Sequence, residues 1–140
     1  MSETALMGAS EPALGLDAYD KDRVAEVATK AYARIAAAWK LKTDDAAALI
    51  GVGARTWARI KKGDWSGRLS KDQLLRISAV TGLYKGLHLY FSDALADRWI
   101  GLENKGPLFA GHPPLRKMID GGLPAIMETR DYVDALRGGV

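Results

Sequence analysis

A run of cationic side chains between residues 55 and 76 is the part of the sequence best suited to binding chemistry. Seven lysines and arginines stand there against two aspartates, a local excess of five positive charges in a chain whose net charge is only +3. Arginine and lysine bind phosphate oxygens, and arginine also pairs with guanine edges. The sequence therefore predicts nucleic-acid contacts at Arg55, Thr56, Arg59, Lys61, Lys62, Arg68 and Lys71.

Two short predicted helices position this set. Residues 43–63 contain an apolar helical segment, a turn at Gly51-Val52-Gly53 and a second helical segment. At about 100° per residue, the second segment places Arg55 and Arg59 on one side and Trp57 on the opposite side. This is the outline of a helix-turn-helix, whose second helix can enter the major groove of DNA. The competing interpretation is a helical hairpin whose basic side simply faces water.

The predicted roles within the set follow from position. Arg55, Thr56 and Arg59 lie near the start of the second helix, where side chains of such proteins reach base edges. The remaining cations lie at the end of that helix and beyond it, and are expected to contact phosphates: Lys61, Lys62, Arg68 and Lys71. One module of this size binds DNA weakly, so recognition of an operator requires a homodimer on a two-fold site.

Helix signals occupy the rest of the chain, and no strand pattern of useful length is present, so the sequence predicts an all-α fold. Thr43 is expected to cap the first helix of the pair. Ser70 and Gln73 have the spacing of a capping box, which predicts a further helix that starts at Lys71. Gly82 is expected to end that helix.

Glycines, prolines and charge divide the chain into predicted parts. Residues 1–20 carry four acidic side chains and no lysine or arginine, and are expected to form a flexible acidic arm. A helical region follows at 21–102. The segment ENKGPLFAGHPP then breaks the helical pattern, which predicts a small second domain at 103–140. Within it, a short helix is expected to start at Pro114 and to end at Gly121-Gly122.

The chain lacks the residues that most enzymes and metal sites need. It contains no cysteine and two isolated histidines, His88 and His112, which excludes thiol chemistry and disfavours a metal centre. His88 is expected to be a core residue. No apolar run approaches the roughly 20 residues that cross a bilayer. We therefore expect a cytoplasmic binding protein without a cofactor or a membrane contact, and not an enzyme.

The order of these features resembles the bacterial antitoxin family often written Xre/MbcA/ParS. The helix-turn-helix part is ALIGVGARTWARIKKGDW, and LSKDQLLRISAVTGLYKGLHLYF follows it. The C-terminal part is similar to the toxin-binding region of that family, with a proline-leucine turn, a glycine-ended short helix and a final helix that closes on glycine. That part is the segment PLFAGHPPLRKMIDGGLPAIMETRDYVDALRGG. The resemblance extends from Lys21 to Val140.

The resemblance implies a Cro-repressor-like helix-turn-helix half and a small helical C-terminal half that binds a toxin. The implied toxin belongs to the RES-domain class, which consumes NAD or transfers ADP-ribose from it. The antitoxin would occlude the NAD pocket of this toxin in a hetero-oligomer, and would repress its own operon through the helix-turn-helix.

Arginine, tyrosine and apolar side chains are frequent anchors in such contacts. The candidates for toxin binding lie on the loop before Pro114 and on the final helix: Leu108, Phe109, Arg130, Tyr132, Val133, Leu136 and Arg137. Phe109 and Tyr132 could equally be core residues of a small domain. The alternative function is a free-standing dimeric helix-turn-helix transcriptional regulator, whose C-terminal half dimerises or senses a small ligand.

Overall fold

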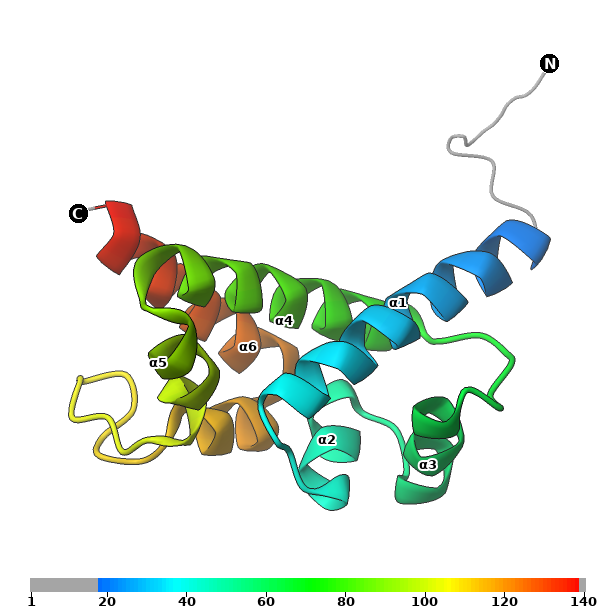
Figure 1. Cartoon of the computed structure of the whole chain (residues 1–140), viewed down its shortest axis with the longest axis horizontal. Helices are drawn as coiled ribbons and strands as arrows, with labels where there is room; N and C mark the ends of the chain where they lie inside the picture. Colours follow the sequence, from blue (N-terminus) through cyan, green and yellow to red (C-terminus); the bar gives the residue numbers. More distant parts are fainter. Residues whose placement is uncertain (1–17, 139–140) are drawn as a thin grey trace, which may run out of the picture.

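Every regular element in residues 18–138, the part of the chain that this computed structural model describes, is helical. The elements are α1 (Ala18–Ala38), α2 (Thr43–Ile50), α3 (Ala54–Lys62), α4 (Lys71–Tyr90), α5 (Asp93–Arg98), the 3-10 turn η1 (Trp99–Gly101) and α6 (Pro114–Gly138). The prediction of an all-α fold with a helix-turn-helix in its N-terminal part is confirmed (Figure 1). The predicted acidic arm lies outside the described residues as far as residue 17.

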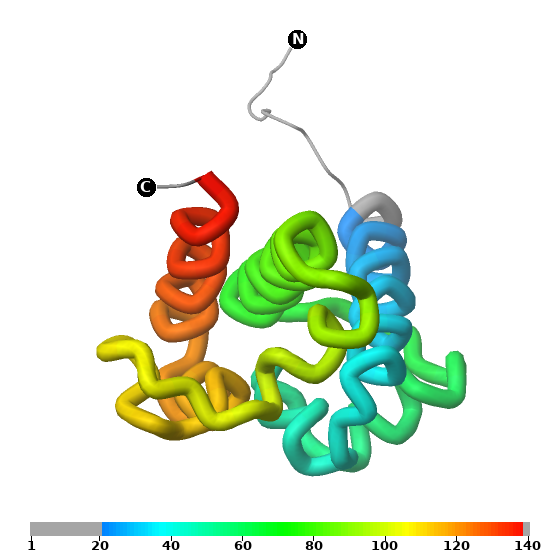
Figure 2. Tube along the Cα trace, turned by 60° about the vertical axis from the view of Figure 1, so that its left-hand side comes forward, coloured from blue at the N-terminus to red at the C-terminus, as the bar shows by residue number. Residues whose placement is uncertain are grey.

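The helix α4 is the element around which the fold is assembled. It packs on α6 on one side and on α1 on the other, so that it lies between them (Figure 2). Its inner surface contributes Val80, Leu83 and Leu87, none of which retains any exposed area. Burying each such side chain stabilises the fold by roughly 1.5–3 kcal/mol. A single hydrophobic core thereby runs from the helix-turn-helix to α6.

Two glycines of α4 let α6 approach closely, and the prediction that Gly82 ends the helix is wrong. The helix continues to Tyr90. A Cβ atom at Gly82 would lie 2.5 Å from Cζ of Arg130, and one at Gly86 would lie 3.4 Å from Cγ1 of Val133. Side chains of α6 occupy the space that the two missing Cβ atoms leave. Gly82 therefore leaves room for the side chain of Arg130 and does not end α4.

The predicted start of α4 is confirmed, whereas the predicted cap of α2 is wrong. The Oγ of Ser70 accepts a hydrogen bond from the backbone N–H of Gln73 at 3.1 Å, and the backbone N–H of Ser70 donates to Oε1 of Gln73 at 2.9 Å. This is a complete capping box. Thr43 is instead the first residue of α2, because the preceding Lys42 takes the N-cap position and offers no side-chain acceptor.

The helix α6 bends at Gly122, whose backbone angles (φ 69°, ψ −152°) are readily adopted only by glycine. The prediction of a short helix that starts at Pro114 and ends at the glycine pair is confirmed. Arg76 of α4 covers this bend: its Nη2 lies 3.2 Å from where a Cβ of Gly122 would be, and its Nη1 lies 3.4 Å from that of Gly51. Asp72 holds Arg76 at 2.8 Å. One arginine therefore contacts both the end of α2 and the bend of α6.

His88 joins the end of α4 to α5. Its Nδ1 lies 2.9 Å from Oδ1 of Asp93 and its Nε2 lies 2.7 Å from Oδ1 of Asp97. The expectation of a core histidine is corrected, because the ring is only partly buried and stands between two carboxylates. Burial lowers the pKa of His88, but the hydrogen bonds and charges of the two aspartates outweigh it, so that the pKa lies above 6.5.

We expect the free energy of unfolding to fall as the pH rises through the folded pKa of His88. The protonated ring gains its two carboxylate partners only in the folded state. Its stabilising contribution is therefore complete below the unfolded pKa of about 6.5 and is lost above the higher folded pKa. Urea denaturation at about pH 5.5 and about pH 8.5 measures this difference in stability.

The two histidines of the chain supply a matched pair of variants for this test. His88→Gln should reduce the difference in stability between the two pH values. His112→Gln changes an exposed histidine in the loop before α6, and should leave the difference as it is. If the stability of both variants depends on pH to the same extent, His88 is not the group responsible for this dependence.

Candidate nucleic-acid interface and partner-binding surface

The helix α3 is held on α1 by a pair of aromatic rings. Trp57 is 3% exposed, and its ring meets Tyr32 edge-on with ring centroids 5.3 Å apart. The hydroxyl of Tyr32 donates a hydrogen bond to the backbone carbonyl of Ala46 in α2 at 2.7 Å. Burial, with a smaller effect of Asp45, raises the pKa of Tyr32, so the hydroxyl remains a donor. One tyrosine thus fixes both helices of the helix-turn-helix.

The turn between α2 and α3 depends on Gly51. Its backbone is left-handed (φ 75°, ψ 31°), and its carbonyl accepts a hydrogen bond from Nε2 of Gln73 at 2.8 Å. Gly53 takes an extended conformation at the N-cap of α3 and does not use a positive φ. The start of α4 therefore holds the turn in place, and α3 leaves it in a defined direction.

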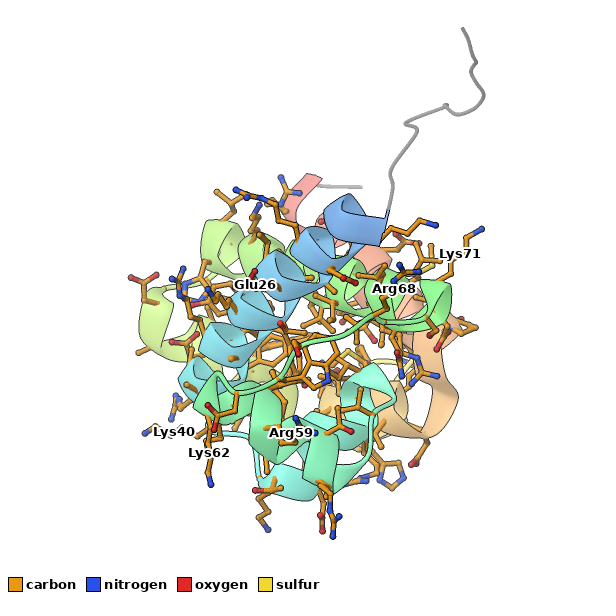
Figure 3. The ribbon with its side chains drawn as sticks, turned by 90° about the vertical axis from the view of Figure 1, so that its right-hand side faces the viewer. Glu26, Lys40, Arg59, Lys62, Arg68 and Lys71 are labelled. Atoms are coloured by element: carbon orange, nitrogen blue, oxygen red, sulfur yellow. The ribbon has the colours of Figure 1, made fainter. Side chains whose placement is uncertain are left out.

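The helix α3 exposes its predicted polar side. Its inner face carries Trp57 and Ile60, which are 3% and 7% exposed. Its first turn contains no acidic residue. Among the predicted contacts, Thr56 is half-buried and four are exposed: Arg55, Arg59, Lys61 and Lys62. Figure 3 shows Lys62 extending away from α3. The structure therefore gathers these cations on the outer side of a helix whose inner side is fixed to the core.

Arg68 and Lys71 lie apart from the cations of α3. In Figure 3, Arg59 stands between Lys62 on one side and the labelled Arg68 and Lys71 on the other. The Nε of Arg68 lies 3.2 Å from Oδ1 of Asp22 in α1, and both side chains are about half exposed. Such exposed pairs contribute only about 0–1 kcal/mol, so a phosphate group can replace Asp22 as the partner of Arg68.

Lys40 is a further exposed cation, next to the helix-turn-helix in the chain, that the predicted set does not include. It lies in the turn between α1 and α2 with a left-handed backbone (φ 55°) and an exposed side chain. Its label lies near that of Lys62 in Figure 3, but Figure 1 shows the turn between α1 and α2 across α2 from α3. The available signal was the alternation Trp-Lys-Leu-Lys directly ahead of Thr43.

Three aromatic rings join the loop after η1 to α6. The centroid of Phe109 lies 5.8 Å from that of Trp99 and 5.2 Å from that of Tyr132, and the rings of Trp99 and Tyr132 stack at 6.2 Å. Phe109 is 2% exposed and Val133 is fully buried. These two predicted toxin contacts are therefore core residues in this structure, because the thin C-terminal part needs their bulk to cover α4 and η1.

The other predicted partner contacts do not form one surface. Leu108, Tyr132 and Leu136 are half-buried and Arg137 is exposed. Arg130 points elsewhere: its guanidinium lies against Gly82, at a groove between α1 and α4. Since residues 130 and 132 are about 200° apart around a helix, the structure separates Arg130 from the aromatic cluster.

Gly82→Ala should raise the free energy of unfolding by up to about 1 kcal/mol, because alanine is favoured over glycine inside a helix. The new Cβ would lie 2.5 Å from Cζ of Arg130, so this flexible, partly exposed side chain must move away. Chemical denaturation measures the change, and Arg130→Ala serves as the background in which no side chain has to move. Gly82→Ala could instead lower the stability when Arg130 is present and not in the Arg130→Ala background. That result would show that the contact of the guanidinium with Gly82 stabilises the fold.

No group of histidine and acidic side chains in residues 18–138 is arranged to hold a metal ion. No helix in that range is both long and apolar enough to cross a membrane.

The geometry defines a helix-turn-helix protein with a cationic second helix and a C-terminal helix packed on the same core. Residues 20–82 match the family described as "Antitoxin Xre-like helix-turn-helix domain". The chain is also similar to the protein of Sinorhizobium fredii called "Uncharacterized protein y4oB", to which it is 36% identical over 112 residues. The aligned region covers 79% of this chain and 84% of that protein. The chain belongs to the same family as that Sinorhizobium protein. No solved structure matches this chain.

Proposed function

We propose that this protein is the antitoxin of a type II toxin–antitoxin pair, and that it acts by binding and not as an enzyme. In this proposal it binds its operator as a homodimer and represses its own operon. It also binds a RES-type toxin and occludes the NAD pocket of that toxin. The observation that carries the proposal is the exposed cationic side of α3 within an antitoxin Xre-like domain. Both partners would be met in the cytoplasm.

For DNA, the proposal assigns recognition to the outer side of α3. Arg55 and Arg59 can each pair with the O6 and N7 atoms of guanine, and Thr56 can donate to or accept from a neighbouring base. Phosphate contacts then orient the helix without reading sequence. The proposed phosphate contacts are Lys61, Lys62, Arg68 and Lys71.

For the toxin, the proposal rests on the C-terminal side chains that keep exposed surface. A nucleotide pocket is blocked by a few well-placed anchors together with polar groups that fix orientation. Leu108 and Tyr132 border the loop after η1, and Leu136 and Arg137 lie near the end of α6. Phe109 and Val133 support these anchors from within the core.

The direct test uses the product of the neighbouring reading frame, purified with and without this protein. An equimolar amount of the antitoxin should stop NAD consumption by that toxin. Arg137→Ala should weaken inhibition about tenfold, the effect of losing an interfacial contact of about 1.4 kcal/mol. Arg34→Ala, an exposed arginine of α1, is the matched control and should inhibit like the unchanged chain. A toxin that stays active beside excess antitoxin would leave the free-standing regulator as the better account.

A further inference from the structure

A recess of about 670 Å³ lies where the end of α1 and the start of α2 meet α5, η1 and the start of α6. Figure 2 shows the end of α1, in cyan, beside the yellow-green chain of α5 and η1. Small-molecule sites occupy roughly 300–1,000 Å³, so the recess has the size of such a site. Its lining shares no residue with the proposed DNA contacts or the proposed toxin contacts. It is therefore a separate candidate site.

The walls of the recess are mostly apolar. Trp39 and Ile100 are its buried lining residues, at 6% and 2% exposed. Leu41 and Leu115 are half-buried, and Leu102 is 43% exposed. An apolar group that covers these side chains removes their remaining surface from water, which is favourable. The walls therefore suit the hydrocarbon part of a ligand.

The charged residues of the recess leave an excess of free positive charge. Both acidic residues that line it already have a basic partner. Oδ1 of Asp45 lies 3.6 Å from Nη2 of Arg116, and Oδ1 of Asp97 lies 2.7 Å from Nε2 of His88. Three exposed cations also line the recess, and none of them forms an ion pair within residues 18–138: Lys40, Lys42 and Arg98. The recess therefore favours an anionic group.

Trp39 adds a hydrogen-bond donor without an acceptor. Its Nε1 is buried, and no acceptor among residues 18–138 lies within hydrogen-bond distance of it. Buried polar groups nearly always have a partner, because an unpaired one costs free energy. Since Trp39 lines the recess, an oxygen atom of a bound molecule can supply the acceptor when the ring turns toward it.

We propose that this recess binds a small carboxylic acid with an apolar body, a binding site beyond the proposed function. The apolar body packs on the walls, and one carboxylate oxygen accepts from the indole N–H of Trp39. The side chains of Lys42 and Arg98 are long and exposed, so they can close on the carboxylate. A neutral molecule would leave these cations without a partner, and an inorganic anion would leave the apolar walls in water.

Three probes test the two parts of the ligand separately. The compound 3-phenylpropionate has an apolar body and a charge, its amide lacks the charge, and acetate lacks the body. In nuclear magnetic resonance spectra of the isotope-labelled full chain, the four tryptophans give indole N–H signals, and Trp39→Phe and Trp65→Phe identify two of them. The signal of Trp39 should shift saturably with 3-phenylpropionate and much less with the other two probes. The signal of Trp65, which does not line the recess, should stay in place.

Each contrary result overturns a definite part of the proposal. A Trp39 signal that stays in place with all three probes would show that only water fills the recess. An equal response to the acid and to its amide would show that the charge is not recognised. Binding of the acid that shifts the signal of Trp65 and not that of Trp39 would place the site elsewhere.

A pair of double variants tests the cations. Lys42→Ala with Arg98→Ala should raise the dissociation constant for 3-phenylpropionate about tenfold, because two charged partners are lost. Both side chains are exposed, so folding should not change, which circular dichroism checks. The matched control is Arg34→Ala with Lys105→Ala, which removes one arginine and one lysine that are exposed and do not line the recess. Equal weakening in both double variants would show that only the net charge attracts the acid, and would overturn the site.

These measurements use neither operator DNA nor a toxin. A chain that fails to bind the acid but binds both partners loses this site and keeps the proposed function. A chain that binds the acid at Trp39 but neither partner keeps the site and loses the proposed function.

Discussion

Replacing both Arg55 and Arg59 by alanine should weaken operator binding by about 2–6 kcal/mol, the sum of about 1–3 kcal/mol for each bidentate contact with a base. Both side chains are exposed on α3, so the fold should remain unchanged. The loss should be larger for the operator than for a scrambled duplex, because base contacts carry the sequence preference. Fluorescence anisotropy with the two duplexes at one fixed salt concentration measures it.

Lys62→Ala is the matched control for this double variant. It removes an exposed cation from the same helix, but one that is proposed to contact phosphate. It should weaken binding to both duplexes alike and lower the slope of log affinity against log salt by about one. Unchanged operator affinity in the Arg55 and Arg59 double variant would show that α3 is not the helix that reads the bases.

Trp99→Ala should lower the free energy of unfolding by about 3–5 kcal/mol, the usual range for truncating a buried tryptophan. Trp99 is 8% exposed, and its ring contacts Phe91, Phe109 and Tyr132. It therefore joins the end of α4, the loop after η1 and α6. For a chain of this size the midpoint of thermal unfolding should fall by about 10–20 °C.

The form of this transition is as informative as its midpoint. Because one core cluster contains Trp57 of α3 and Val133 of α6, the variant should still unfold in a single transition. Circular dichroism and the fluorescence of the three remaining tryptophans should therefore give the same midpoint. Two separate transitions would show that the C-terminal part unfolds independently. Trp65→Ala, which changes a half-buried ring in the loop after α3, should have a smaller effect.

The helix-turn-helix was predictable because its signals are local. The glycine at the end of α2, the capping box of Ser70 and the opposite sides of α3 each depend on residues within a few positions of one another. Arg55 and Arg59 are exposed because Trp57, on the opposite side of the helix, is buried. The same reasoning predicted the end of the short helix at Gly121-Gly122, and the structure has a backbone conformation that favours glycine at Gly122.

Two of the errors arose where another helix decided the role of a residue. Gly82 has the sequence context of a helix end, but α6 brings Arg130 into the space beside it. His88 has the context of a core residue, but α5 folds back and places two aspartates at its ring. The spacing of residues along α4 indicates neither contact.

The all-helical fold, the cationic helix and the acidic character of residues 1–20 could be predicted from the sequence, because helical period, caps and composition depend on residues close together in the chain. Which C-terminal side chains face outward could not be predicted in this way, because it depends on the packing of α6. Phe109 and Val133 became core residues and Arg130 reached the groove between α1 and α4, because these positions depend on how α6 packs on α4. That packing joins residues about fifty positions apart, and pairwise contacts over such separations leave no periodic trace in the sequence.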